Sequence, residues 1–261
     1  MIITLIISIL PVYLVGLYIY KKDKNKEPKK LLKRLFIYGM LSCIPAAIVE
    51  VSLGNLFGSE ESMNIIALFL YVFISVALVE ELFKWLITYR LTFNNYDFDE
   101  LYDAIVYAVF VSLGFACFEN IFYVLDSGVK VGLYRAITAI PGHASDAIIM
   151  GNFLGLAKLA SINKNSKLCK KKLLLSILLP ALAHTIYDFC LLTDNVFFLL
   201  VFAIFLVSMY IYGIKKVKRV SSSKEQLHDN KILALNSHIY CPMCGTMGHG
   251  NYCHNCGTKL R

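Results

Sequence analysis

The sequence predicts an all-α protein: a polytopic membrane bundle of about seven transmembrane helices, followed by a small C-terminal zinc ribbon. Hydrophobic residues make up 57% of the 261 residues, above the roughly 45–50% that is usual in soluble domains. The excess lies in blocks of about 18 or more residues with few charges, which is the length that crosses a bilayer. Only about the last 45 residues read as water-soluble.

The apolar blocks place the expected helices in order along the chain. We expect spans at 1–20, 32–53, 64–89, 102–125, 133–157, 172–193 and 196–214. The first block has no basic residues before it and several after it, so we do not read it as a cleavable signal peptide. Together the blocks define a membrane domain over residues 1–219.

Basic residues set the expected orientation. Lys and Arg cluster at 21–34, 158–172 and 215–219, each beside an apolar block. The positive-inside rule then puts the N-terminus outside and the C-terminus in the cytoplasm. The loop at 90–101 supports this least, because Arg90 stands there among acidic residues. The net charge of +8 therefore predicts contact with membrane lipid and no nucleic-acid partner.

The C-terminal part predicts a linker over 220–238 and a zinc ribbon over 239–261. Two CxxC pairs, each followed by glycine, are the expected zinc ligands: Cys241, Cys244, Cys253 and Cys256. Four thiolates close the tetrahedral shell of the metal, so this zinc is expected to be structural. The cytoplasmic partner of such a ribbon stays unknown. The remaining cysteines lie in or beside apolar blocks and are expected to pack there.

Ionisable residues inside four spans predict a function beyond anchoring. They are Glu80, Glu81 and Lys84 in the third span, Glu119 in the fourth, His143 and Asp146 in the fifth, and His184 and Asp188 in the sixth. A charge at the centre of a span costs roughly 2.5–3.5 kcal/mol on insertion scales. Helical spacing offers each group a helper, and the pairs are Glu80–Lys84, Glu119–Tyr123, His143–Asp146 and His184–Asp188. Because adjacent side chains point about 100° apart, we expect only one of the two glutamates to meet Lys84.

Structural explanations exist for each residue taken alone. The Glu80–Lys84 pair can act as structural glue, Lys84 can snorkel to the interface, and Tyr123 can face the core or the lipid. Arg135 and Glu50 fall near outer ends and are expected at the interface. These explanations weaken when four helices each bring such a group. Carboxylates with two histidines suit general acid–base chemistry on water.

Four short motifs carry a family resemblance. Residues 80–84 match EExxK, 118–123 match FExxxY, 141–144 read PGHA, and 184–188 match HxxxD. This set, in this order on successive spans, resembles the PrsW family of intramembrane proteases. The related CAAX prenyl endopeptidases and bacteriocin-immunity proteases have an arginine one position later than Lys84 and a different second motif, so the PrsW family fits better.

The resemblance implies site-1 cleavage of a single-span membrane protein, an anti-sigma factor, near the outer face. It implies that Glu80 and Glu81 activate water beside an essential His184, with Glu119 and His143 as further site residues. Lys84, Tyr123 and Asp188 would support them.

Three questions stay open at this point. A catalytic zinc and a metal-free glutamate–histidine mechanism are both compatible with the residues. A CAAX-type protease, a transporter or proton-coupled channel, and a non-catalytic receptor are the alternative functions. The expected spans also put Glu80 and Glu119 at depths that differ by roughly 10 Å, which would separate Glu119 from the site unless helices tilt.

Overall fold

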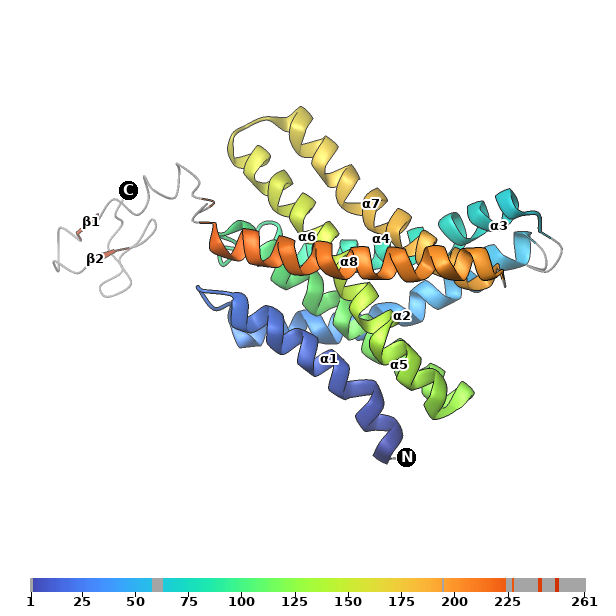
Figure 1. Ribbon diagram of the computed structural model, residues 1–261. Coiled ribbons are helices and arrows are strands. Elements are labelled where there is room, and N and C mark those ends of the chain that lie inside the picture. The colour runs from blue at the N-terminus through green and yellow to red at the C-terminus, as the bar shows by residue number, and fades with distance from the viewer. Residues whose placement is uncertain are drawn as a thin grey trace.

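The computed structural model describes residues 2–57, 63–193, 195–223, Leu227 and two short strands. Its helices are α1 (Ile2–Lys22), α2 (Lys29–Phe57), α3 (Ile65–Tyr71), α4 (Leu78–Thr92), α5 (Leu101–Ile137), α6 (Ala139–Ile162), α7 (Ser166–Leu192) and α8 (Val196–Ser222). One π-helical stretch, η2 (Val72–Ala77), joins α3 to α4 without a break. The expected all-helical bundle is therefore confirmed for the described residues (Figure 1).

Five helical stretches of the described chain are long and apolar enough to cross a membrane. They run over Lys29–Phe57, Ile65–Thr92, Leu101–Ile162, Ser166–Leu192 and Val196–Ser222. The third includes both α5 and α6 and is 62 residues long. These lengths and compositions indicate a multi-pass membrane protein. The count of seven spans and the outside position of the N-terminus stay predictions.

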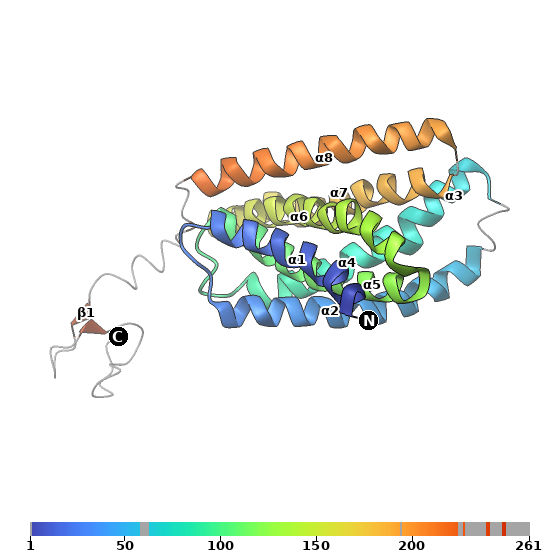
Figure 2. The same cartoon turned by 60° about the horizontal axis from the view of Figure 1, so that its bottom comes forward.

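Helix α5 is the centre of the bundle and is enclosed by α1, α2 and α6 (Figure 2). Glycines let α2 and α5 touch backbone to backbone. A Cβ atom on Gly114 would come within 2.0 Å of the carbonyl oxygen of Phe36, and one on Gly39 would come equally close to that of Val111. Such close approach fixes the depth of α5 relative to its neighbours. By contrast, only 6% of the most apolar 18-residue stretch of α8 is buried within the protein.

Helix α5 contains one sharp change of direction. Gly128 has φ 85° and ψ 179°, which is not a helical conformation. The chain after it forms the segment 129–137, and Gly132 of this segment packs against Val124 of α5. Residues 129–137 therefore fold back along the end of the helix from which they come. The two expected spans at 102–125 and 133–157 are joined through this turn.

The C-terminal part is described only in pieces. Helix α8 continues to Ser222, so the first residues of the expected linker at 220–238 are helical. Leu227 is buried, and its backbone N–H donates to the carbonyl oxygen of Asp99. Strands β1 (Ile239–Tyr240) and β2 (Met247–Gly248) pair antiparallel. The four cysteines of the predicted zinc ribbon lie outside the described residues.

Candidate active site

Lys84 on α4 lies at the centre of a buried polar network. Its side chain is 0% exposed, and its Nζ donates to Glu80 Oε2 and to Glu81 Oε1, both at 2.8 Å. The expectation that only one glutamate would meet Lys84 is therefore wrong. Positions i−3 and i−4 are both neighbours on a helix surface, and the long lysine stem places Nζ between them. Burial also excludes snorkelling for Lys84.

His143 on α6 receives the third contact of this ammonium group. Lys84 Nζ lies 3.3 Å from His143 Nδ1, and His143 Nε2 lies 2.9 Å from Glu119 Oε2. An ammonium group has no acceptor, so Nδ1 must accept and the proton of a neutral ring is on Nε2. Nε2–H then donates to the Glu119 carboxylate. The hydrogen bonds thus assign the tautomer of His143.

His184 on α7 lies between two carboxylates. Its Nδ1 is 3.2 Å from Glu81 Oε1, and its Nε2 is 3.2 Å from Asp188 Oδ2. The HxxxD spacing therefore forms the expected pair. The ring can donate to both carboxylates only as the imidazolium. The two histidine rings are nearly perpendicular, with centroids 5.3 Å apart.

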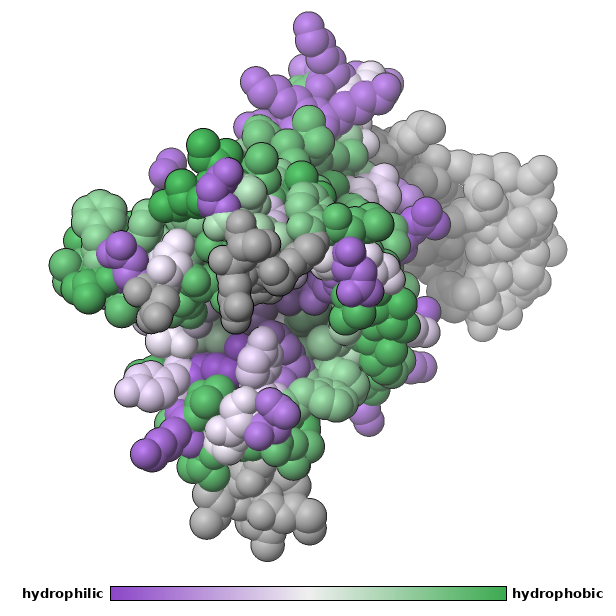
Figure 3. All heavy atoms as spheres, turned by 90° about the vertical axis from the view of Figure 1, so that its right-hand side faces the viewer, coloured by the Kyte–Doolittle hydropathy of each residue, from purple (hydrophilic) through white to green (hydrophobic). Residues whose placement is uncertain are grey.

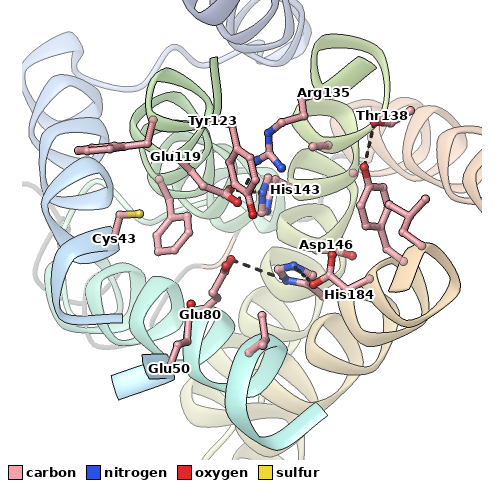
Figure 4. Close-up of a pocket in the computed structure, with 18 of the residues that line it drawn as sticks. Cys43, Glu50, Glu80, Glu119, Tyr123, Arg135, Thr138, His143, Asp146 and His184 are labelled. Atoms are coloured by element: carbon pink, nitrogen blue, oxygen red, sulfur yellow. Dashed lines mark hydrogen bonds and ion pairs between the residues drawn. The ribbon is translucent and has the colours of Figure 1, made fainter. Parts of the chain in front are cut away.

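The expected His143–Asp146 pair is not among the side-chain hydrogen bonds described for His143. The hydrogen bonds described for His143 go to Lys84 and Glu119 instead, because α5 and α4 face its ring. Asp146 is 5% exposed and lies beside His184 (Figure 4). Its carboxyl group lines the same cavity as His184.

Glu119 belongs to the same network as the other candidate residues. The contacts run without a break from Glu80 through Lys84 and His143 to Glu119. The depth difference of roughly 10 Å expected from the span limits therefore does not separate the two glutamates. His143 of α6 lies between them and bridges the gap, and the close approach of the helices makes this possible.

Arg135 is a site residue that the sequence analysis missed. It was expected at the outer interface, but the fold-back after Gly128 brings it to Glu119, with Nη2 2.9 Å from Oε1. Its guanidinium also lies 3.8 Å from the ring centroid of Tyr123. Tyr123 is 44% exposed and meets Arg135 through its ring. The turn residues Asp-Ser-Gly at 126–128 are the sequence signal for this reversal.

Glu80, Glu119, His143 and His184 line one large cavity of about 1120 Å³, whereas Glu81 and Lys84, both 0% exposed, are not among its lining residues. Its walls come from α2, η2 and α4–α8, and most of them are apolar. Figure 3 views the end of the molecule where α3 lies and shows hydrophilic atoms recessed among hydrophobic ones. Glu50 of α2, which was expected at the interface, also lines the cavity. The volume exceeds the usual range of small-molecule sites, roughly 300–1,000 Å³.

The donor set of this site fits a metal ion. Ligand atoms of Glu80, Glu81, His143 and His184 all lie within 4.8 Å of one another, and all four residues are buried. Two carboxylates and two imidazoles suit zinc. Glu81 Oε2 is buried and has no hydrogen-bond partner among the described residues, so it keeps free lone pairs for a metal or a water. Lys84 donates to three of the four residues and would compete with a bound metal.

Comparison with known proteins agrees with these motifs. A family model described as PrsW family intramembrane metalloprotease matches residues 27–213. A "Protease PrsW" of Oceanobacillus iheyensis is 37% identical over 206 residues, covering 79% of this chain and 90% of that protein. A "Protease PrsW" of Bacillus subtilis is 34% identical over 210 residues, covering 78% and 89%. No solved structure matches the chain.

Proposed function

Because this chain belongs to the PrsW family of intramembrane metalloproteases, we propose that it performs site-1 cleavage of a single-span membrane protein, an anti-sigma factor, near the outer face of the membrane. One observation carries this proposal. Glu81 is 0% exposed, its Oε2 has no partner among the described residues, and His184 lies 3.2 Å from its other oxygen. A buried carboxylate with a free oxygen beside an imidazole is suited to activate water.

The proposed reaction is hydrolysis of a peptide bond. Glu81 Oε2 accepts a proton from water as the water oxygen attacks the scissile carbonyl carbon. The Lys84 ammonium and the His184 imidazolium supply positive charge near the oxygen that becomes negative. The proton held by Glu81 then passes to the departing amine, and one water is consumed for each bond cleaved.

The remaining residues hold this arrangement in place. Glu80 shares the Lys84 ammonium with Glu81, which keeps both carboxylates on one side of α4. Asp188 accepts from His184 Nε2 and fixes the orientation of that ring. In an alternative state without the Lys84 ammonium between them and with both histidine rings neutral, Glu80, Glu81, His143 and His184 would hold a catalytic zinc, which would supply a Lewis acid that polarises the scissile carbonyl. Each of these four residues offers one possible ligand atom.

The cavity is suited to a peptide segment drawn out of a membrane helix. Its lining is mainly apolar, with the charged groups gathered at one place. Apolar walls accept the side chains of a transmembrane substrate, and the charged groups then meet its unwound backbone. We further propose that the chain lies in a bacterial cell membrane with its N-terminus outside. A structural zinc in the cytoplasmic ribbon would then serve recognition of a cytoplasmic partner.

The test uses the full chain reconstituted in liposomes with a single-span candidate substrate. Cleavage by the wild type and its loss in Glu81→Gln and in His184→Ala are expected. Glu100→Gln is the matched control, because it removes a carboxylate at the start of α5 that takes no part in the ion pairs described for Lys84 and His184. Ion or solute flux without cleavage would support a transporter instead. Unchanged cleavage in both site variants would remove the glutamate–histidine mechanism.

A further inference from the structure

We propose that Arg135 is a positioning residue of this site, which acts by holding the Glu119 carboxylate against His143. This inference rests on the proposed protease function. Arg135 does not belong to any of the four motifs, and it contacts neither Lys84 nor the two glutamates of α4 in the hydrogen bonds described. Its effect on the site is therefore transmitted through Glu119.

The backbone delivers Arg135 to the site by an unusual turn. Gly128 occupies φ 85° and ψ 179°, a region that essentially only glycine adopts. After this turn, Gly132 lies against Val124, and a Cβ there would come within 2.4 Å of its Cγ2. The segment 129–137 is thus held close to α5. This contact brings residue 135 back to residues 119 and 120.

Three contacts fix the guanidinium of Arg135. Nη2 pairs with Glu119 Oε1 at 2.9 Å, and Nε donates to Asn120 Oδ1 at 3.2 Å. The face of the Tyr123 ring lies 3.8 Å from the guanidinium carbon. Asn120 is 0% exposed, so its oxygen is a rigid anchor. A planar group held at two edges and one face has little freedom left.

The fixed guanidinium in turn holds the Glu119 carboxylate, because each of its two oxygens has its own partner. Oε1 is bound to Arg135 and Oε2 to His143 Nε2 at 2.9 Å. The side chains of Arg135 and Glu119 are 16% and 17% exposed, so water has limited access to the pair. Without the guanidinium, the described residues offer Oε1 no other cation at this distance. The carboxylate would then rotate, and the Nε2–H tautomer of His143 would lose its fixed acceptor.

A purely structural ion pair would have different effects from a positioning residue. A structural pair changes stability alone, and a conservative replacement that keeps the charge restores it. A positioning residue changes the rate with bound substrate. A misplacement of about 1 Å can lower a rate roughly 100-fold, so kcat should fall while KM changes little. The same segment provides a control in Lys130, which is exposed and carries the same charge.

The experiment measures kcat and KM for cleavage by the full chain in liposomes. Arg135→Ala is expected to lower kcat roughly 10- to 100-fold, Arg135→Lys to recover part of the loss, and Lys130→Ala to cleave like the wild type. Millimolar guanidinium, well below denaturing concentration, is expected to restore Arg135→Ala and to leave Glu119→Gln unchanged. The Glu119→Gln/Arg135→Ala double variant is expected to be no slower than Glu119→Gln.

Several outcomes would overturn the proposal. An Arg135→Ala variant with the wild-type kcat would do so, as would a loss matched by Lys130→Ala. A double variant slower than Glu119→Gln by the full Arg135 factor would show that Arg135 does not act through Glu119. If Arg135→Ala folds poorly, its folded fraction is isolated and assayed with millimolar guanidinium. Failure of guanidinium to restore cleavage in that fraction would refute the positioning role of Arg135. Absence of cleavage by the wild type would instead reject the proposed function.

Discussion

Replacing Lys84 with methionine tests the centre of the polar network most directly. Methionine is also unbranched and one heavy atom shorter than lysine, and it removes the ammonium that both glutamates share at 2.8 Å. Loss of one partner from a buried ion pair typically costs roughly 3–5 kcal/mol. A chain of this size loses roughly 2–4 °C of melting temperature per kcal/mol, so we expect a fall of roughly 6–20 °C.

The assay is thermal unfolding of the purified full chain in detergent, followed by circular dichroism. Lys84→Arg is the control that keeps the charge. The double variant Lys84→Met/Glu81→Gln removes one of the two carboxylates that have lost the Lys84 ammonium. The double variant is expected to melt above Lys84→Met. A Lys84→Met variant that melts with the wild type would refute the reasoning, because the network would then not need its cation.

The same substitution also predicts a change in metal binding. Lys84 donates to three of the four residues that could hold a metal, so the ammonium and the metal exclude each other. With the four tail cysteines replaced by serine, Lys84→Met is expected to bind zinc more tightly than its Lys84 parent. Calorimetric titration measures this, and equal affinities would show that the metal does not use these donors.

Three further perturbations have defined outcomes. Burial raises the pKa of Glu27 from 4.5 to about 7, and the weaker hydrogen bonds from Tyr107 and Asp103 oppose this shift. The protonated Glu27 therefore stabilises the fold fully below about pH 4.5, and this stabilisation is lost as pH rises through 7. Glu27→Gln should therefore gain melting temperature relative to the wild type between pH 5 and pH 8, and a constant difference would contradict this. Gly114→Ala should destabilise by roughly 1–3 kcal/mol or more, because its Cβ would meet the Phe36 carbonyl at 2.0 Å. Gly16→Ala, with its nearest neighbour at 3.4 Å, should melt like the wild type. Serine replacement of the four tail cysteines should remove one zinc per chain by elemental analysis, and unchanged zinc content would reject the ribbon.

The sequence predicted the parts of the site that depend on spacing along one helix. Residues three or four positions apart are neighbours on a helix, so the Glu80–Lys84 and His184–Asp188 pairs follow from the motifs alone. The convergence of four helices was also predictable in outline, since isolated charges in spans are costly and must meet one another.

The missed features depend on tertiary geometry. His143 could have paired with Asp146 by spacing, yet the packing of α4 and α5 gave it Lys84 and Glu119 instead. Arg135 reaches the site through one non-helical residue, Gly128, and apolar periodicity carries no information about such a reversal. The span limits alone likewise could not place Glu119 in the network, because they contain no information on how closely neighbouring helices approach.

The π-helical stretch η2 has a consequence for insertions and deletions in this chain. A π-helical turn is wider than an α-helical one, which is equivalent to one extra residue within an otherwise regular helix. Deleting a single residue from Val72–Ala77 would let the backbone run as an ordinary helix from Ile65 to Thr92. Each residue accounts for about 100° of rotation, so α3 would turn by that angle relative to α4, which carries Glu80 and Glu81. The extra residue thus lets α3 and α4 face different neighbours.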